Sequence, residues 1–450
     1  MCSFHFSTIK PVQIDGDDGI NFYLKKRGPD ATNIVYNKNH TFIHNLLSLT
    51  GAFTVQPLIE DDIYVLFNGE LYNYLDFGKF DNDTKCIIAA YNKWGIEFPR
   101  YLDGEFAITL VDYKKQIILV TSDVFACKPI WISIENKEFG ASSYKSSLLR
   151  TGFSNNKIEK LPANTTRIYS LDNKELLFEN TIYDFNLDQY KNTFDDWILA
   201  FEQSVAKRCL NVREGMFIGL SSGYDSGSIL CALLNLNIKF DSYTLSGTEN
   251  EKVLQQRYEK ILNNSVGNSY ICKNKSAEFN IKASKWMNEN VEEFLYQTWT
   301  LRSDYNERSL RLHEDNGSLG LTTICDWANL NNKKIHISGM GADEHISDYG
   351  FNGQSKYFHS NFGGLYPKDL KTIFPWPSFY GSSMISYLGK EEYIGGGHGI
   401  ENRYPFLDPK VVQEFLNLSV DLKNSKYKSV LHEYLTRNNF PFDPGQKIGF

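Results

Sequence analysis

The residues best suited to chemistry lie in a loop of small and acidic residues after a predicted strand. GMFIGL leads into SSGYDSGS (residues 215–228), whose end opens a predicted helix. Small residues let the backbone close around a phosphate, which the N–H groups of a helix N-terminus attract. Ser221, Ser222 and Ser226 add hydroxyl donors. Asp225 fits beside a phosphate only when Mg²⁺ lies between them, so the loop indicates a magnesium–phosphate site. Taken alone, such a loop is as often a plain strand-to-helix turn.

A second loop of this kind occurs in KIHISGMGADEH (residues 334–345), where another predicted strand ends in a glycine-rich turn and two acids. In a parallel sheet both loops lie at the carboxyl ends of their strands, where ligands bind. Acids near a glycine turn are usually solvated, but the pairing of two such loops favours a shared site. We therefore expect Asp225 and Asp343 to hold one Mg²⁺–pyrophosphate group between them.

Cys2 is a candidate nucleophile, because it becomes the first residue when the initiator methionine is removed. A thiol beside a free α-amino group has its own base, since the amine can relay the proton. Most single cysteines are buried structural residues. The position of Cys2 therefore adds little until other residues support it.

The elements that must position these residues differ between the two parts of the chain. Residues 1–185 are β-rich, with a predicted hairpin over residues 106–122. The clearest helix in this part covers residues 84–95 and ends at a glycine. The polar stretch 186–192 is typical of a linker, so we expect one domain to end before it.

Beyond the linker, predicted strands and helices alternate. Thr193 and Asp196 stand three apart ahead of an apolar stripe over residues 197–205, which predicts a capped amphipathic helix. The β-α-β-α order implies a parallel, doubly wound sheet in an α/β domain over residues 192–450. The part beyond about residue 350 is predicted to be mostly helical.

The composition excludes several classes of protein. The 450 residues carry a formal net charge of −7, which argues against nucleic acid or an anionic membrane as a partner. No apolar run approaches the ~18 residues of a membrane span, and the N-terminus lacks an apolar targeting segment. The seven cysteines form no CxxC pair, which favours free thiols in a reducing cytosol over disulfides or a zinc site. We therefore expect a cytoplasmic protein.

Taken jointly, the motifs of the second half resemble those of the asparagine synthetases. LSSGYDS (220–226) resembles the SGGxDS pyrophosphate loop of the ATP pyrophosphatase group, and SGMGADE (338–344) with Tyr349 resembles the family's SGEGADE…GY segment. ENRYPFLD (401–408) looks like its E-x-R-x-P-F-L-D. KYKSVLHEYL followed by QKIGF resembles its C-terminal ending. The resemblance implies an ATP-pyrophosphatase domain of the adenine nucleotide α-hydrolase type.

The same resemblance implies roles for individual residues. Leu220 and Leu245 would line the adenine site, and Lys447 would stabilise the transition state above an acyl-adenylate. Asp225 and Asp343 would bind Mg²⁺. The implied ATP-binding residues are Leu220, Ser221, Ser222, Gly223, Asp225, Ser226, Leu245, Ser338 and Gly339.

The first half resembles the class II glutamine amidotransferase domain, an Ntn-hydrolase αββα sandwich. The motifs that carry the likeness occur in the family's order. They are RGPD (27–30), FNGELYN (67–73), NDT (82–84), LDGEFAITLVD (102–112) and SDVFACKPIW (122–131).

This likeness implies that Cys2 attacks glutamine while the Asn68 side chain and the Gly69 N–H stabilise the oxyanion. Glu70 and Asp83 would hold the α-ammonium group of glutamine. The glutamine-binding segment would be formed by Leu46, Leu47, Ser48, Leu49 and Thr50.

SDVFACKP lacks the Arg and Gly that the family usually carries there, which we expect to affect only packing. Two other departures bear on the chemistry. Leu46 stands where an arginine would clamp the α-carboxylate, a loss of a few kcal/mol of binding. Met340 replaces the glutamate of SGEGADE, and a thioether cannot transfer a proton. Tyr349 and Glu401 are the ionisable groups that we expect to take over, as a dyad like that of the β-lactam synthetases. We therefore expect aspartate to be a poor substrate and a larger or less polar carboxylic acid to be the acceptor.

The leading hypothesis is a glutamine-dependent, amide-forming ligase that uses ATP and Mg²⁺ and releases AMP and pyrophosphate. Its partners would be glutamine and a small carboxylic acid. Homodimers are common among enzymes of this type. One alternative is an intramolecular amide ligase of the β-lactam synthetase or lasso cyclase type, without need of ammonia. Another is a catalytically inactive binding protein, which the retained Asp225, Asp343 and Lys447 disfavour.

Overall fold

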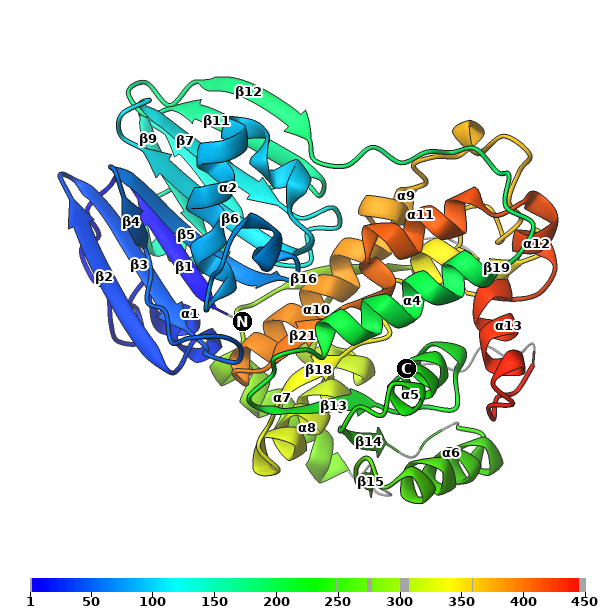
Figure 1. Cartoon of the computed structure of the whole chain (residues 1–450). Helices are drawn as coiled ribbons and strands as arrows, with labels where there is room; N and C mark the ends of the chain where they lie inside the picture. Colours follow the sequence, from blue (N-terminus) through cyan, green and yellow to red (C-terminus); the bar gives the residue numbers. More distant parts are fainter. Residues whose placement is uncertain are drawn as a thin grey trace.

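The computed structural model describes residues 2–245, 247, 249–272, 277–299, 307–357 and 359–444. The chain forms two bodies, one rich in strands and one rich in helices (Figure 1). An extended segment between them runs along the helical body before α4 (Asp195–Arg208) begins. The backbone N–H groups of Tyr190 and Lys191 donate to the carbonyl oxygen of Asn417, which ties this segment to the second body.

The first body consists of two antiparallel sheets of six strands each. The first sheet has the order β10 (Ile158–Lys160), β8 (Trp131–Glu135), β9 (Glu138–Ser142), β1 (Ser3–Ser7), β3 (His40–Leu46), β2 (Ala31–Asn37). The second sheet has the order β12 (Leu176–Thr181), β11 (Thr165–Ser170), β7 (Ile117–Ser122), β6 (Gly104–Asp112), β5 (Ile63–Leu71), β4 (Leu58–Glu60).

Alternating side chains divide the cores of this body into layers. Leu66 of β5 joins Phe4 and Phe6 of β1 in the core between the two sheets. Its neighbours Val65 and Phe67 join the core beneath α2 (Cys86–Trp94), which covers the second sheet. Helices α1 (Phe22–Arg27) and α3 (Lys145–Thr151) pack against the first sheet. The predicted αββα sandwich is confirmed.

The second body is built on a five-stranded sheet in which every pairing is parallel. Its order is β15 (Ser269–Cys272), β14 (Asp241–Leu245), β13 (Gly215–Gly219), β18 (Lys333–Ile337), β21 (Glu401–Arg403). The chain proceeds outward from β13 to β15 and then crosses to β18 on the other side. This reversal creates a switch point between β13 and β18, where doubly wound sheets bind ligands.

Helices surround this sheet and make up most of the remaining chain (Figure 1). They are α4, α5 (Tyr224–Asn235), α6 (Glu251–Asn264), α7 (Ala277–Asn290), α8 (Asn316–Leu330), α9 (Pro377–Tyr380), α10 (Ser383–Gly397), α11 (Pro409–Asn417), α12 (Val420–Asn424) and α13 (Ser429–Arg437). The two small hairpins are β16 (Leu295–Trp299) with β17 (Glu307–Arg311) and β19 (Gly350–Phe351) with β20 (Gln354–Ser355). The predicted α/β class is confirmed, whereas α4 begins after Phe194 without the predicted side-chain cap. None of the described helices is long and apolar enough to span a membrane.

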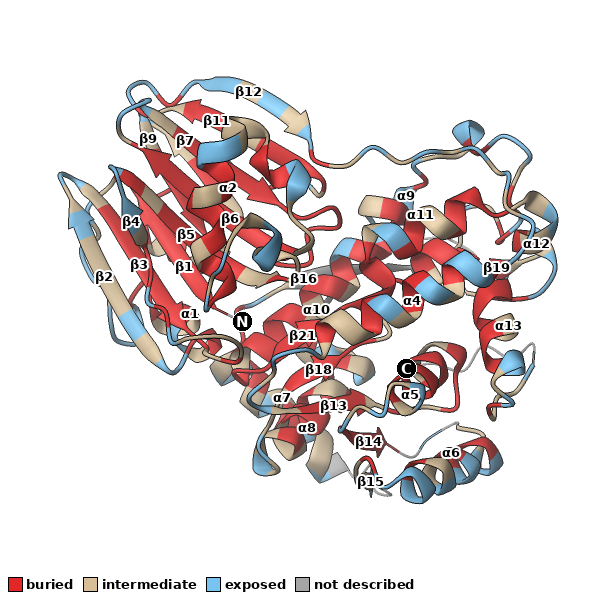
Figure 2. Cartoon of the chain, viewed as in Figure 1, coloured by how far each residue is buried: buried red, intermediate tan, exposed pale blue. Residues whose placement is uncertain are grey.

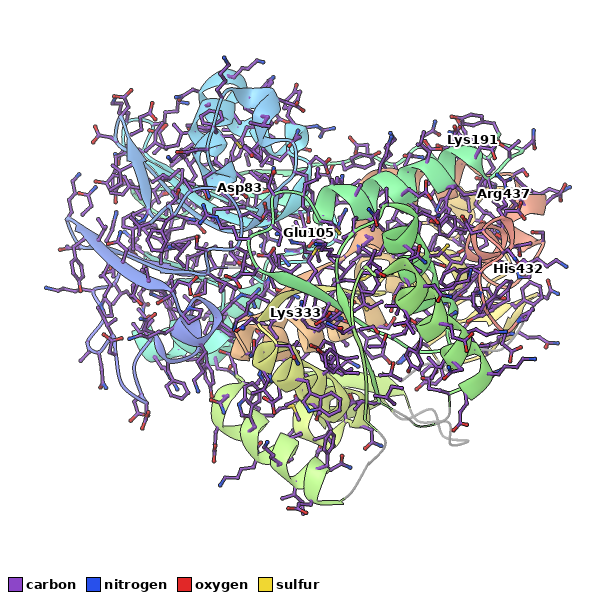
Figure 3. The ribbon with its side chains drawn as sticks, turned by 60° about the horizontal axis from the view of Figure 1, so that its bottom comes forward. Asp83, Glu105, Lys191, Lys333, His432 and Arg437 are labelled. Atoms are coloured by element: carbon purple, nitrogen blue, oxygen red, sulfur yellow. The ribbon has the colours of Figure 1, made fainter. Side chains whose placement is uncertain are left out.

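Buried residues fill the region where the two bodies meet (Figure 2), and ion pairs lie among them. Glu105 of β6 lies at this junction (Figure 3) and accepts from Nε of Arg208 on α4 at 2.8 Å. Arg27 and Lys128 of the first body both form ion pairs with Glu392 of α10. Removing one member would leave a buried charge uncompensated, so the network favours a single arrangement of the two bodies.

Candidate active site

The Cys2 site lies at the edge of the first body, against the second. Cys2 directly precedes β1, and its side chain is buried. Arg27 holds the start of the strand, because its Nε donates to the carbonyl oxygen of Cys2 at 3.0 Å. Burial raises the pKa of the Cys2 thiol to about 11, so the thiol needs a base to become a nucleophile. The residues that line the pocket are Cys2, Leu46, Leu47, Ser48, Leu49, Thr50, Ala52, Thr54, Phe67, Gly69, Glu70, Asn82, Asp83, Thr84 and Glu401.

Asn68 has a side chain suited to an oxyanion site. It lies on the same face of β5 as Leu66, which packs in the core between the sheets, and it is not among the described residues that line the Cys2 pocket. Both polar atoms of the Asn68 amide are buried without a hydrogen-bond partner in the described part of the chain. Leaving a buried amide unpaired costs about 1–3 kcal/mol of stability, which indicates that a ligand forms hydrogen bonds with the Asn68 amide.

The backbone conformation at position 69 requires a glycine. Its φ of +147° lies in the region that favours glycine, and a Cβ there would lie 1.9 Å from the carbonyl oxygen of Glu105. The residue can therefore bring its N–H close to a ligand without a side chain in the way.

The pocket contains three acids. Asp83 accepts from the N–H groups of Leu71 at 3.0 Å and Thr84 at 2.8 Å. Glu70 accepts from Oγ1 of Thr50 at 2.9 Å. Burial raises the pKa of Glu70 to about 8 and that of Asp83 to about 6. These carboxylates can hold an ammonium group, as the resemblance implies.

Leu46 contributes an apolar wall, and no lysine or arginine is among the described residues that line the pocket. Arg403 of β21 forms ion pairs with two acids of the pocket. Its Nη2 lies 3.1 Å from Oε2 of Glu70, and its Nε lies 2.6 Å from Oε1 of Glu401. The pocket volume is about 20 Å³, enough for one water molecule. Glutamine therefore requires the pocket to open.

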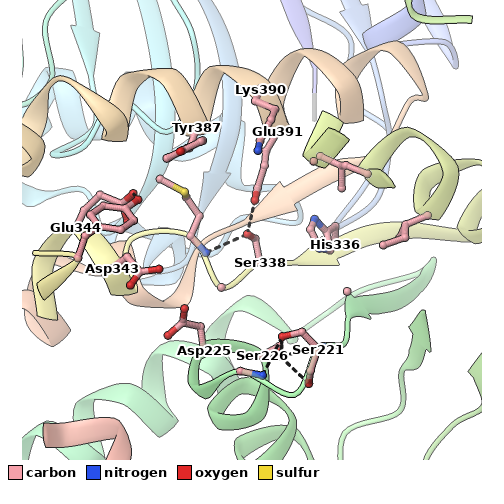
Figure 4. A pocket seen from close by; sticks show the side chains of 18 of the residues that line it. Ser221, Asp225, Ser226, His336, Ser338, Asp343, Glu344, Tyr387, Lys390 and Glu391 are labelled. Atoms are coloured by element: carbon pink, nitrogen blue, oxygen red, sulfur yellow. Dashed lines mark hydrogen bonds between the residues drawn. The ribbon is translucent and has the colours of Figure 1, made fainter. Parts of the chain in front are cut away.

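The second site is a cavity of about 350 Å³ at the switch point between β13 and β18 (Figure 4). Ser221, Asp225 and Ser226 line it from the first loop, and Ser338, Gly339 and Asp343 from the second. Arg257 of α6 donates to the carbonyl oxygens of Ser221 at 2.5 Å and Gly223 at 3.0 Å. The N–H groups of Ser221 and Gly223 donate within the loop, to Oγ of Ser226 and Oγ of Ser221, both at 3.1 Å, so a phosphate would have to replace these bonds.

Asp225 and Asp343, the predicted metal ligands, both pair with one lysine. Nζ of Lys428 is 2.6 Å from Oδ1 of Asp225 and 2.8 Å from Oδ1 of Asp343. Burial acts against the charge, but the two carboxylates hold the pKa of Lys428 well above its usual range. The carboxylates thus already share one cation, and two carboxylates plus phosphate oxygens are a usual Mg²⁺ environment. Asp225 and Asp343 therefore fit Mg²⁺ when a nucleotide supplies the remaining ligands.

Several predicted ATP residues do not line this cavity. Leu220, directly after β13, and Leu245, the last residue of β14, are buried in apolar cores. Oε2 of Glu249 lies 2.5 Å from both N and Oγ of Ser222, where it occupies donors that a phosphate would use. Lys447 lies outside the described residues.

The structure places Tyr349 and Glu401, the two residues of the predicted dyad, in different pockets. Tyr349 lines the cavity and donates its hydroxyl to Glu344. Glu401 lies in the Cys2 pocket instead, where Arg403 donates to it. The motif ENRYPFLD contains Glu401 but does not tell which face of its strand this side chain takes.

β21 explains this placement, because it separates the two sites. Glu401 and Arg403 face the Cys2 side, whereas Oδ1 of the intervening Asn402 lies 2.9 Å from Nδ1 of His336. His336 lines the nucleotide cavity. Lys428, Glu344, His336 and Glu391 are cavity or loop residues that sequence reasoning missed.

Comparisons with known proteins agree with this two-site arrangement. The glutamine amidotransferase domain family matches residues 18–191. A protein of Methanocaldococcus jannaschii named as a glutamine-hydrolyzing asparagine synthetase is 24% identical, over 95% of this chain and 82% of its own. The glutamine-hydrolyzing asparagine synthetase of Gallus gallus is also 24% identical, over 93% of this chain and 76% of its own.

Among solved structures, the glutamine phosphoribosylpyrophosphate amidotransferase of B. subtilis has a TM-score of 0.31 and 12% identity, over 61% of this chain and 67% of that one. This likeness is too weak to carry an argument.

The amidotransferase match and these relatives indicate a glutamine-dependent ligase. The chain is similar to glutamine-hydrolyzing asparagine synthetases over nearly its whole length, and its first part matches the glutamine amidotransferase domain family.

Proposed function

We propose that this enzyme converts a carboxylic acid to an amide, with ATP as the activating substrate and glutamine as the nitrogen donor. The observation that carries the proposal is that one strand, β21, borders both sites: Glu401 lines the Cys2 pocket and Asn402 contacts His336 of the nucleotide cavity. Ammonia released at the Cys2 pocket would then pass β21 to reach the other cavity. The relatives' names, which specify glutamine hydrolysis, support the same reading and do not favour an intramolecular ligase.

In the first domain, the Cys2 thiolate attacks the side-chain amide of glutamine. The α-amino group of Cys2 takes the thiol proton and passes it to the leaving ammonia. The Asn68 amide and the Gly69 N–H stabilise the oxyanion, while Glu70 and Asp83 hold the α-ammonium group. Water then releases glutamate from the acyl-enzyme.

In the second domain, a carboxylate of the acceptor attacks the α-phosphate of ATP and displaces pyrophosphate. The Ser221–Ser226 loop and Lys428 bind the phosphates. Mg²⁺ held by Asp225 and Asp343 would neutralise charge on the pyrophosphate. Met340, Leu321 and Tyr357 line the cavity, which suits an acceptor larger or less polar than aspartate.

The test is ATP–pyrophosphate exchange across a panel of carboxylic acids that includes aspartate. We expect AMP and pyrophosphate as products, with exchange lost in Asp225→Ala and Asp343→Ala. ADP and phosphate as products would exclude the adenylation route. Cys2→Ser tests the other domain: glutamine-dependent amide formation should disappear while activity with ammonium chloride remains. Full glutamine-dependent activity in Cys2→Ser would show that Cys2 is structural.

A further inference from the structure

Glu391 of α10 has a carboxylate oxygen that no described residue satisfies. Its Oε1 accepts from Oγ of Ser338 at 2.9 Å, whereas its Oε2 is buried and has no hydrogen-bond partner in the described chain. The side chain lines the nucleotide cavity and points toward Ser338 (Figure 4). A buried carboxylate oxygen in this state is costly, so its place on a cavity wall indicates a donor brought by a ligand.

This carboxylate lies close to the loop position that departs from the family pattern. Oγ of Ser338 also accepts from the backbone N–H of Met340 at 3.1 Å, so one hydroxyl connects Met340 to Glu391. Tyr387, one turn earlier on α10, lines the same cavity. The carboxylate that the loop lacks at Met340 therefore reaches this part of the cavity from a different element.

We propose that Glu391 is the general base of the amidation step. The assignment rests on the proposed function. As the nitrogen of ammonia attacks the acyl carbon of the adenylate, Oε2 of Glu391 takes one of its protons. The C–N bond forms, the C–O bond to the AMP phosphate breaks, and the electron pair leaves with AMP. The proton on Glu391 is then released to solvent with the products.

The groups around Glu391 suit a base of this kind. Burial raises the pKa of Glu391 to about 7, although the Ser338 hydroxyl and the ammonium group of Lys390 act in the opposite direction. Glu392 on α10 and Glu344 from the turn after β18 raise it further. A base whose pKa lies near the working pH both accepts and releases a proton readily. Amide formation should therefore increase with pH between about 6 and 8.

Glu391→Gln in the full-length enzyme tests the assignment by separating the two half-reactions. The probes are L-aspartate, L-glutamate, succinate and hexanoate, each with ATP, and ammonium chloride as the nitrogen source. With the acid that gives the most exchange, we expect ATP–pyrophosphate exchange within about twofold of the wild type. Amide formation should fall by about 10²–10³-fold, the usual size of a general-base contribution. Glu289→Gln on α7, whose side chain is 60% exposed, is the matched control and should change neither rate.

Two further variants separate a chemical role from a structural one. Glu391→Asp keeps a carboxylate, so its rate of amide formation should be at least tenfold higher than that of Glu391→Gln. Ser338→Ala removes a hydrogen bond to the ionised form and should move the pH midpoint of amide formation upward. An equal fall of exchange and amide formation in Glu391→Gln, or unchanged amide formation, would overturn the assignment. Absence of exchange in the wild type with every acid would overturn the proposed function itself.

Discussion

Nζ of Lys428 lies 2.6 Å from Oδ1 of Asp225, although 203 positions separate the two residues in the chain. The same ammonium group is 2.8 Å from Asp343, so a lysine from the start of α13 joins the two loops of the nucleotide cavity. The lysine is buried, whereas the Asp225 and Asp343 side chains are 25% and 19% exposed. Solvent and Mg²⁺ can therefore reach the carboxylates.

Lys428→Met should make the protein depend on Mg²⁺ for stability. Without metal, we expect the free energy of unfolding to fall by about 2 kcal/mol, less than the roughly 3–5 kcal/mol for a fully buried pair, because the carboxylates are partly exposed. Adding Mg²⁺ should raise the Tm of the variant more than that of the wild type, as the metal takes the place of the lysine. Thermal unfolding with and without Mg²⁺ measures this. The exposed neighbour Lys426 provides the control, Lys426→Met. Equal responses to Mg²⁺ would contradict the prediction.

Asn68→Ala should impair glutamine hydrolysis without destabilising the fold. We expect kcat for glutamine hydrolysis to fall by about 10²–10³-fold, the usual cost of one oxyanion donor. The Tm and the ammonium-dependent activity should stay unchanged, because the Asn68 amide makes no hydrogen bond to a described residue. Asn73→Ala is the control, since its side chain bonds the backbone of Tyr101 and Asp103 and should lower the Tm instead. A lower Tm in Asn68→Ala would assign the residue a structural role.

Glutamine binding should weaken as the pH falls. Asp83 and Glu70 must be ionised to hold an ammonium group, and burial raises their pKa values to about 6 and about 8. Protonation removes the negative charge, so KM for glutamine should rise as the pH decreases from 8 and most steeply below 6. Steady-state glutaminase assays give KM, which separates this effect from the ionisation of Cys2 in kcat. The ammonium-dependent reaction serves as the reference for the other site. A KM that does not vary over this range would exclude these acids as glutamine ligands.

Met340 should limit the use of aspartate. We expect asparagine formation from aspartate, ATP and ammonium to lie below the ordinary range of about 1–10³ s⁻¹. Met340→Glu should raise this rate at least tenfold, because a carboxylate returns to the loop. Met340→Leu keeps an apolar wall of similar size and should behave as the wild type. Ordinary turnover of aspartate by the wild type would show that Met340 is tolerated.

The sequence alone was sufficient for the fold class of both domains. The hairpin over residues 106–122 and the helix near residues 84–95 follow from local periodicity, and both are present as β6–β7 and α2. Asp225 and Asp343 were expected to meet because both loops follow parallel strands, whose carboxyl ends share an edge of the sheet. These features depend on spacing along the chain, which the sequence displays.

Other features depended on contacts between distant segments. The placement of Glu401 with Cys2 required knowing which face of β21 meets the first domain, and a three-residue strand carries too little alternation to decide it. Lys428 reaches Asp225 only because α13 packs against α5. Glu391 acquires its unsatisfied oxygen only when α10 places it beside Ser338 in a cavity. Local sequence therefore determined the elements and their loops. The pairing of charges across the interior arose from tertiary packing, because a buried charge can pair only with the groups that the fold packs against it.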